Sequence, residues 1–393
     1  MNNSCQNQAY KMDFLAYLKN YLVNRNKFFI RFMKSFLLCY LLSNALIASA
    51  TPSHNSPITF NHLSIEELKS VGPVNTIMID SQGFMWLGGS DGLARYDGYK
   101  IKLFKHNPKD PQTLSHNQVW DIVEDHQGFI WVATESGLSR LDRNTHLMTR
   151  YKHDVNNRNS LGGSIVRNLL FDSKNQLWVG TYNGLDKYDF VSDSFIHYQH
   201  DANDITSISD NLIYSIIETA DGTLWVGTNH GLNSYDRQQN NFSHLFHDSN
   251  NINSLTGNAI HAIHEDSKHR LWIGTAKGLN LLNRVTGEFS RYQENQDTPN
   301  TLSNNYVASI ESDNKNQLWL STGSGLNVFD ITNEHFSHYI NDPFEANSIS
   351  GSFVTSLFKD DTQNMWIATY PEGVSLNKFN RESGIFTTYN IEH

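Results

Sequence analysis

Four residues with chemically versatile side chains recur at one interval in the middle of this 393-residue chain: Trp120, Arg167, Tyr214 and His261. Consecutive members are 47 residues apart, and each stands eleven residues before another tryptophan. Aromatic faces combined with hydrogen-bonding tips suit sugar-like or other polar organic ligands. We therefore predict that the four form a ligand site wherever the fold brings the repeats together. The alternative is that they are ordinary solvated loop residues.

The same position in the other repeats is held by Asn75, Ala308 and Thr355. A position that differs between repeats is free to specialise, whereas positions fixed in every repeat build the framework. The turns that follow the tryptophans add further candidates, which are Glu135, Tyr182, Asn183, Asn229 and His230. The last repeat has a longer turn, in which Tyr370 and Glu372 are expected at the rim of the site. We expect these turns on the same face as the first four residues, because both kinds of loop lie at one end of a four-stranded blade.

The tryptophans themselves mark the elements that must position these side chains. After a first step of 45 residues they are spaced by 47, at Trp86, Trp131, Trp178, Trp225, Trp272, Trp319 and Trp366. Spacing this regular indicates a repeat architecture. Each repeat shows short apolar runs separated by turns rich in Asp, Asn and Gly, which predicts four strands with the tryptophan in the second.

Four antiparallel strands in each of seven repeats predict an all-β fold, a seven-bladed β-propeller of four-stranded antiparallel blades. The blades are expected over residues 74–106, 118–153, 165–200, 212–247, 259–294, 306–341 and 353–390. A solenoid is the alternative, and it is disfavoured because solenoid repeats are usually shorter. Residues 60–63 and 386–389 both resemble a fourth strand, and either could complete the seventh blade.

Three repeated features within the blades have structural interpretations. The tryptophans are interpreted as packing between blades. The Asp that precedes each hairpin, as at Asp172, is interpreted as turn chemistry. The first strand places apolar residues three apart, as in Val74 and Ile77, which breaks strict alternation and predicts a strand packed on both faces.

The first fifty residues differ in composition from the rest. They carry six Lys and Arg, one Asp and both cysteines, Cys5 and Cys39, so the remainder has a net charge of −15. Arg31 and Lys34 precede an apolar run that ends at residues 48–50 in Ala-Ser-Ala, which predicts a secretory signal peptide and a periplasmic body starting at residue 51. A complete signal also begins at Met33, which is the expected true start. An uncleaved membrane anchor is the alternative, and the acidic body argues against a nucleic-acid partner.

Motifs of known catalytic and metal sites were sought and not found. The sequence contains no His-Glu-x-x-His, Walker, Gly-x-Ser-x-Gly or EF-hand spacing. His153, His200 and His247 occupy one repeat position, which favours a structural role. The Asp- and Asn-rich segment at 153–160 could hold a cation, but Asx turns explain it without one. We therefore expect no catalytic residue, no metal and no cofactor.

The repeat resembles a known family. The pattern Asp-x-x-Gly-x-Leu/Ile/Met-Trp-Val/Ile-Gly-Thr-x-x-Gly-Leu-x-x-Tyr-Asp, seen at 80–97 and 225–236, is similar to the two-component regulator propeller repeat. The segments at 60–67 and 95–99 also resemble the start of such proteins. The resemblance implies a periplasmic ligand-binding sensor domain of hybrid histidine kinases or diguanylate cyclases.

The chain departs from that family in lacking a kinase phosphoacceptor region, a nucleotide-binding segment and a Gly-Gly-Asp-Glu-Phe motif. The expectation is therefore a truncated or stand-alone sensor, which binds a small polar or glycan-like ligand and works with a membrane-bound signalling partner or a second propeller. Two alternatives remain open at this point. One is an enzyme similar to streptogramin lyases, and the other is a protein-docking scaffold.

Overall fold

The structure, a computed structural model, describes residues 70–298, 300–313, 315–342, 344, 348–362, 364–370, 375–380 and 385–389. For residues 375–380 and 385–389 it describes the backbone, and the side chain of Lys378 alone. The predicted leader at 1–50, the segment at 60–67 and Glu372 lie outside the described residues. The propeller belongs to a compact unit from Ile58 to His393.

Each tryptophan repeat folds into four short strands that are consecutive in the chain. The strands of the first four repeats are β1 (Val74–Ile79), β2 (Met85–Gly89), β3 (Gly92–Tyr96), β4 (Ile101–Phe104), β5 (Val119–Glu124), β6 (Ile130–Thr134), β7 (Gly137–Leu141), β8 (Met148–Tyr151), β9 (Val166–Phe171), β10 (Leu177–Thr181), β11 (Gly184–Asp189), β12 (Ser194–Tyr198), β13 (Ile213–Glu218), β14 (Leu224–Thr228), β15 (Gly231–Asp236) and β16 (Asn241–Leu245). The strands of the last three are β17 (Ile260–Glu265), β18 (Leu271–Thr275), β19 (Gly278–Leu282), β20 (Phe289–Tyr292), β21 (Val307–Ser312), β22 (Gln317–Thr322), β23 (Gly325–Asp330), β24 (His335–Tyr339), β25 (Phe353–Lys359), β26 (Met365–Tyr370), β27 (Ser375–Asn380) and β28 (Ile385–Tyr389).

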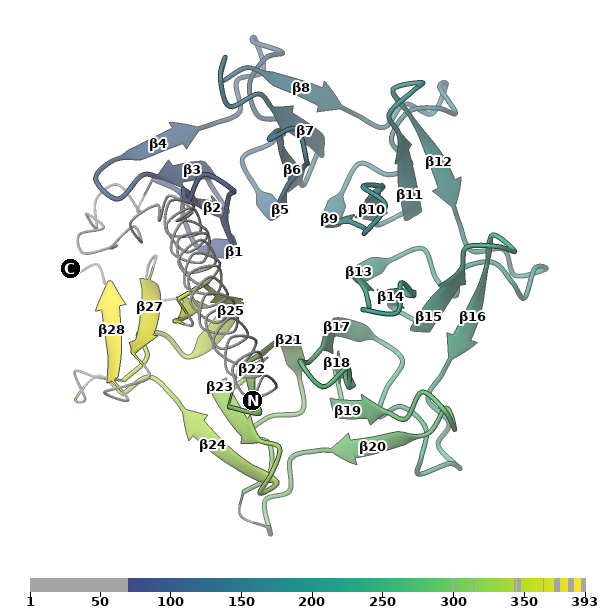
Figure 1. Ribbon diagram of the computed structural model, residues 1–393, viewed down its shortest axis with the longest axis vertical. Helices are drawn as coiled ribbons and strands as arrows, with labels where there is room; N and C mark the ends of the chain where they lie inside the picture. Colours follow the sequence, from purple (N-terminus) through teal and green to yellow (C-terminus); the bar gives the residue numbers. More distant parts are fainter. Residues whose placement is uncertain are drawn as a thin grey trace, which may run out of the picture. The chain divides into compact units, whose positions relative to one another are not determined.

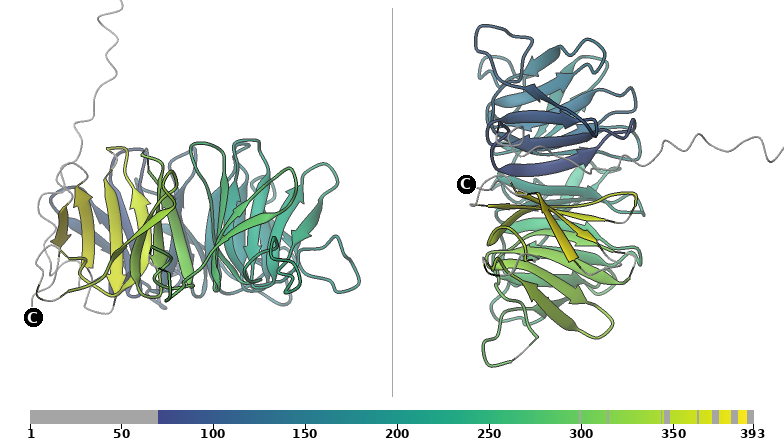
Figure 2. Two further views of the ribbon diagram at one scale, coloured as in Figure 1. Left: turned by 90° about the horizontal axis from the view of Figure 1, so that it is seen from below. Right: turned by 90° about the vertical axis from the view of Figure 1, so that its left-hand side faces the viewer.

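The strands form an all-β propeller, as the repeat predicts. There are seven four-stranded antiparallel sheets, β1–β4, β5–β8, β9–β12, β13–β16, β17–β20, β21–β24 and β25–β28, numbered here as blades 1 to 7. The blades stand around a central channel with the first strand of each innermost (Figure 1). The strands run between the two faces of the ring (Figure 2), so the loops are gathered on those faces.

The ring closes where blade 7 packs against blade 1. The fourth strand of the seventh sheet is β28, which pairs with β27. The C-terminal segment, and not the segment at 60–63, therefore supplies that strand. Thr355 Oγ1 in β25 donates a hydrogen bond of 2.7 Å to the Val74 carbonyl in β1. Trp366 packs in one cluster with Val74 and Ile77. Each blade is built from four strands that are consecutive in the chain. Among the described residues, the ring is therefore closed by the packing of blade 7 against blade 1.

The first strand of every blade contains a β-bulge, which accounts for the three-residue offset of its apolar residues. The strand also packs on both faces as expected, since Val74 and Ile77 lie in one core cluster and Met78 packs against the next. In blade 1 the pairing with β2 skips from Val74 to Thr76, which leaves Asn75 as the extra residue. The same skip recurs in the other six blades. Because a bulge adds one residue, Val74 and Ile77 are both buried although they are three apart. The offset marks the bulge, and packing on both faces is not needed to explain it.

The tryptophans lie buried between neighbouring blades, as expected. Trp178 packs against Ile213 and Ile216 of the next blade. Gly180, two residues further, faces Ile213 so closely that an added Cβ would lie 2.8 Å from it. The small residue after each tryptophan is therefore what lets the next sheet approach.

The Asp before each hairpin does more than form a turn. Asp172 Oδ1 accepts hydrogen bonds from the backbone N–H groups of Lys174 and Gln176, at 3.0 and 2.9 Å. Its other oxygen accepts one of 3.0 Å from Trp178 Nε1. The same indole-to-Asp bond occurs at Trp86, Trp131, Trp272, Trp319 and Trp366. Blade 4 differs, because Thr219 replaces the Asp and the buried Nε1 of Trp225 has no partner.

The histidines at one repeat position tie the loops between blades, which confirms their predicted structural role. The Nδ1 atoms of His153, His200 and His247 lie 2.7, 2.8 and 2.6 Å from the carbonyl oxygens of Leu161, Ile208 and Leu255. No helix in the described part of the chain is long and apolar enough to span a membrane.

Candidate functional site

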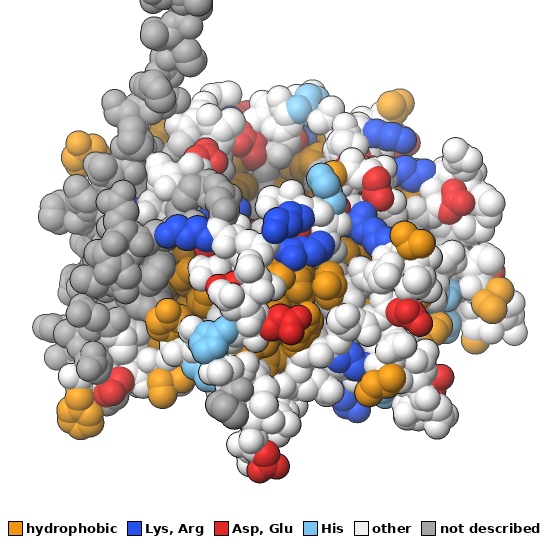
Figure 3. Space-filling view, turned by 60° about the horizontal axis from the view of Figure 1, so that its bottom comes forward, with side chains coloured by type: hydrophobic (Ala, Val, Ile, Leu, Met, Phe, Trp, Pro, Cys, Tyr) orange, Lys and Arg blue, Asp and Glu red, His pale blue; other side chains and the backbone are white. Residues whose placement is uncertain are grey.

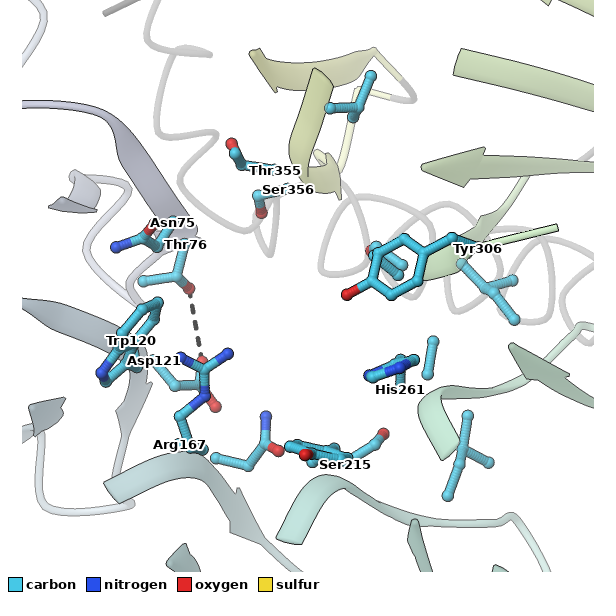
Figure 4. A pocket seen from close by; sticks show the side chains of 18 of the residues that line it. Asn75, Thr76, Trp120, Asp121, Arg167, Ser215, His261, Tyr306, Thr355 and Ser356 are labelled. Carbon is cyan, nitrogen blue, oxygen red and sulfur yellow. Dashed lines mark hydrogen bonds between the residues drawn. The ribbon is translucent and has the colours of Figure 1, made fainter. Parts of the chain in front are cut away.

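The bulge residues converge on the central channel. A cavity of about 400 Å³ lies there, and its lining includes the bulge residue of every blade, which are Asn75, Trp120, Arg167, Tyr214, His261, Ala308 and Thr355. A bulged residue leaves the regular ladder, which re-aims its side chain. The bulge is thus the local device that turns the variable position toward the channel. The four residues predicted from their spacing all line this cavity, and Figure 4 labels Trp120, Arg167 and His261 among them. Their role in binding stays a prediction.

Aromatic rings form a continuous arc along one part of the wall. The ring centroids of Tyr182 and Tyr214 are 6.3 Å apart, and Tyr214 lies 5.0 Å from His261. His261 is in turn 4.9 Å from Tyr306. Separations of this size are those of favourable aromatic pairs, so each ring holds its neighbour in place.

Arg167 and Trp120 continue the arc at its other end. The guanidinium carbon of Arg167 lies 3.6 Å from the Trp120 ring centroid and 5.9 Å from that of Tyr182. Trp120 Nε1 donates a hydrogen bond of 2.7 Å to Glu135 Oε2, which orients the indole under the guanidinium. Glu135 and Tyr182 come from the turns between second and third strands. Both contact residues that line the cavity, but neither is itself among the lining residues.

The other turn residues point elsewhere. Asn183 Nδ2 donates to the Gly162 carbonyl at 2.7 Å, and Asn183 is exposed. His230 is exposed beside Phe246, at a centroid distance of 5.4 Å, and Asn229 is also exposed. Tyr370 is 47% exposed. None of these four is among the residues that line the described cavity.

Within the turn of blade 3, the difference between Tyr182 and Asn183 has a local cause. The first residue of the turn is tied to the inner strand, since Tyr182 N donates to the Ile165 carbonyl at 3.1 Å. The second residue is one step further from that strand, and Asn183 N bonds to Thr181 Oγ1 at 3.0 Å instead. Its side chain is therefore directed to the loops between blades.

Two further sets of lining residues were missed by the sequence reasoning. Tyr306 and Phe353 stand two residues before the bulge of their blades. A ring of mostly small polar residues follows the bulge directly, and comprises Thr76, Asp121, Asn168, Ser215, Ala262, Ser309 and Ser356. Both positions also vary between repeats, so comparing all positions across repeats would have found them.

Asp121 is the acidic member of this second ring. Burial raises the pKa of its carboxyl to about 6, even though the backbone N–H groups of Leu169 and Ile122 each donate to it at 2.8 Å. Thr76 Oγ1 also donates to it, at 3.4 Å. Beside it, Asn168 has a buried Oδ1 that accepts no hydrogen bond within the described residues. The channel therefore holds an acid that changes charge within a mild pH range.

The aromatic groups of the arc are uncharged near neutral pH. Burial, and then the charge of Arg167, lowers the pKa of His261 below its usual value. Burial raises the pKa values of the Tyr214 and Tyr306 hydroxyls. Neutral imidazole and phenol groups both donate and accept hydrogen bonds, which suits a ligand rich in hydroxyls. Within the described residues no three His, Cys, Asp or Glu side chains are grouped so that they could hold a metal ion.

Sequence comparison finds the same repeat elsewhere. The profile of the family described as Two component regulator propeller matches residues 113–136, 160–183, 207–230 and 254–277, each of which spans a bulge and its tryptophan. The repeat is that of the two-component regulator propellers. A 71-residue stretch is 30% identical to Histidine kinase P4 of Formosa agariphila, and it covers 18% of this chain and 5% of that kinase.

Solved structures agree with this assignment. The extracellular domain of BT3049 from B. thetaiotaomicron, assigned to a hybrid two component system, is 25% identical with a TM-score of 0.65. The match covers 77% of this chain and 39% of that one. Virginiamycin B lyase from Staphylococcus aureus is 12% identical with a TM-score of 0.58, over 79% of this chain and 96% of the lyase, which shows a likeness of fold alone. The comparisons support a sensor-type propeller.

Proposed function

We propose that this protein is the ligand-binding sensor propeller of an extracytoplasmic signalling receptor, and that a small polar or glycan-like molecule binds at the arc from Trp120 to Tyr306. The observation that carries the proposal is the convergence of the bulge residues on one cavity. The seven blades place seven different side chains at one structural position. A specific binding site needs such variety, whereas packing between blades would favour the same residue in each.

The chemistry of the arc supports a sugar-like ligand. Aromatic faces bind the apolar faces of sugar rings, and neutral Tyr and His tips bond to hydroxyls. The repeat family and the BT3049 domain support a role in two-component signalling, and output through a diguanylate cyclase is the alternative that the sequence resemblance implies. The Ala-Ser-Ala site at 48–50 and the extracellular origin of that domain support export to the periplasm.

The face shown in Figure 3 carries acidic and basic side chains intermixed. A surface of this kind provides no continuous basic patch for nucleic acid. The acidic net charge of the chain agrees with this, so a nucleic-acid partner is not part of the proposal.

A glycan array probed with the exported protein tests the proposal. The double variant Trp120→Ala/Arg167→Ala should lose binding to every glycan that the parent captures, while its melting temperature stays nearly unchanged. His230→Ala is the matched control, because His230 belongs to an equivalent turn but lies outside the cavity. Unaltered binding by the double variant would move the site elsewhere, and cleavage of a ligand by the parent would favour an enzyme.

A further inference from the structure

This inference rests on the proposed function and concerns the chemical class of the ligand. We propose that the channel recognises an acidic saccharide, with a single carboxylate of a uronate-type sugar held by Arg167 and the sugar ring placed along Tyr214, His261 and Tyr306. The carboxylate of such a ligand matches the Arg167 end of the arc, and its sugar ring matches the aromatic end at His261 and Tyr306.

Arg167 is presented to the channel without an acidic partner. It is the bulge residue of β9, and its guanidinium lies over Trp120 at 3.6 Å from the ring centroid. Within the described residues its guanidinium makes no hydrogen bond and no ion pair. Stacking occupies the face of the guanidinium and leaves its N–H edge, which is the part that binds a carboxylate in a two-point contact.

Three arginines that lie between blades behave differently. Arg143 lies 3.1 Å from Asp80 and 2.9 Å from Glu124. Arg237 is 2.7 Å from both Asp172 and Glu218, and Arg284 likewise contacts two carboxylates. These arginines join neighbouring blades. Arg167 stacks on Trp120 of the neighbouring blade but makes no ion pair within the described residues, so its charge is available to a ligand.

The residues around Arg167 hold its guanidinium in this position. Glu135 holds the indole of Trp120 through the 2.7 Å hydrogen bond from Nε1, and the Tyr182 ring centroid lies 5.9 Å from the guanidinium carbon. A fixed planar fork loses little freedom when it binds, which favours specific recognition of a planar carboxylate.

The charge of the cavity favours a monoanion. Arg167 is the only Lys or Arg among the residues that line the described cavity, and Asp121 is the only Asp or Glu. One cation suffices for a singly charged carboxylate, whereas a phosphate or sulfate cluster would need further cations. Burial raises the pKa of Asp121 to about 6, so the repulsion between this acid and an anionic ligand weakens below that pH. Burial lowers the pKa of His261, so its imidazole adds no positive charge at neutral pH.

Isothermal titration of the exported protein with three probes tests the inference. The probes are trigalacturonate, galactotriose of equal length, and inorganic phosphate. We expect trigalacturonate alone to bind. Arg167→Ala should weaken that binding roughly 10- to 100-fold, as expected for loss of a charged hydrogen-bonded pair. Arg167→Lys should recover part of it, because Lys keeps the charge without the fork.

Arg158→Ala is the matched control, since it removes one positive charge from an exposed loop. Equal binding of galactotriose and trigalacturonate, unaffected by Arg167→Ala, would overturn the acidic-sugar inference and leave the sugar-binding proposal standing. Phosphate binding as tight as trigalacturonate would overturn it in favour of an inorganic anion. If no saccharide binds in the titrations or on the glycan array, both proposals fail.

Discussion

The blade cores and the channel wall use the same repeat in opposite ways. At the core position every repeat has a tryptophan, and six of the seven indoles donate to an Asp of their own blade. At the bulge position, eleven residues earlier, the repeats hold seven different residues. The first position contacts the next blade, and the second faces a cavity. Substitutions should therefore affect stability at the core and binding at the wall.

Removing a core tryptophan should have the largest effect on stability. Trp178→Ala and Trp225→Ala should each lower the free energy of unfolding by about 3 to 5 kcal/mol, because each opens a cavity between packed sheets. Trp178 should lie at the upper end, since its loss also removes the bond to Asp172. Urea unfolding measures both. Binding should decrease only through unfolding, and a variant that melts like the parent would refute the core assignment.

Removing the acceptor of that indole should cost less. Asp172→Ala leaves Trp178 Nε1 and Arg237 without their carboxylate, which lies 2.7 Å from Arg237. We expect a loss of about 2 to 3 kcal/mol in the free energy of unfolding. Asp172→Asn should retain part of it through the remaining amide oxygen. Equal losses for the two variants would show that charge, and not the hydrogen bonds, matters here.

The pH dependence of stability tests the burial of Asp121 at the wall. Its folded pKa of about 6 lies above the usual value of 3.8 for an Asp carboxyl, so its contribution to stability is fully present below pH 3.8 and is lost as pH rises through 6. This amounts to roughly 1 to 3 kcal/mol between pH 4 and pH 7. Urea unfolding at both values should show a smaller loss for Asp121→Asn than for the parent. An equal loss in both proteins would mean that the carboxyl is not buried.

Blade 4 offers a core substitution that should raise stability instead of lowering it. Thr219 stands where the other blades have Asp, and Trp225 Nε1 is buried without a partner. Thr219→Asp should supply the acceptor and raise the free energy of unfolding by about 1 kcal/mol. Thr219→Ala is the control and should bring no gain. A less stable Asp variant would show that blade 4 cannot accommodate the charge.

The smallest effect on stability is expected at the channel. The double variant Trp120→Ala/Arg167→Ala should change the free energy of unfolding by less than about 1 kcal/mol, because Trp120 is only partly buried at the edge of the core between blades 2 and 3 and Arg167 stacks on it without an ion pair. Calorimetric melting of the parent and the variant measures this. A loss as large as that of Trp178→Ala would make the channel wall part of the core.

Much of the fold could be predicted from spacing alone. The interval between tryptophans indicates the repeat, and the turn residues indicate four strands in each. The variable position also follows from spacing, since Trp120, Arg167, Tyr214 and His261 are aligned without any knowledge of their contacts. The tryptophan spacing, the turn residues and the variable position are local and periodic, so they can be read directly from the sequence.

Tertiary structure decided what those residues do. The bulge that turns them inward arises from pairing with the second strand, and the sequence reasoning did not identify it because it attributed the three-residue offset to packing alone. The stacking of Arg167 on Trp120 joins two blades, and Tyr306 enters the arc through a position that the spacing did not single out. Asn183 and Asn229 were expected at the site and lie outside it. Contacts between blades depend on how sheets pack around a ring, and the periodicity of one repeat carries no record of that packing.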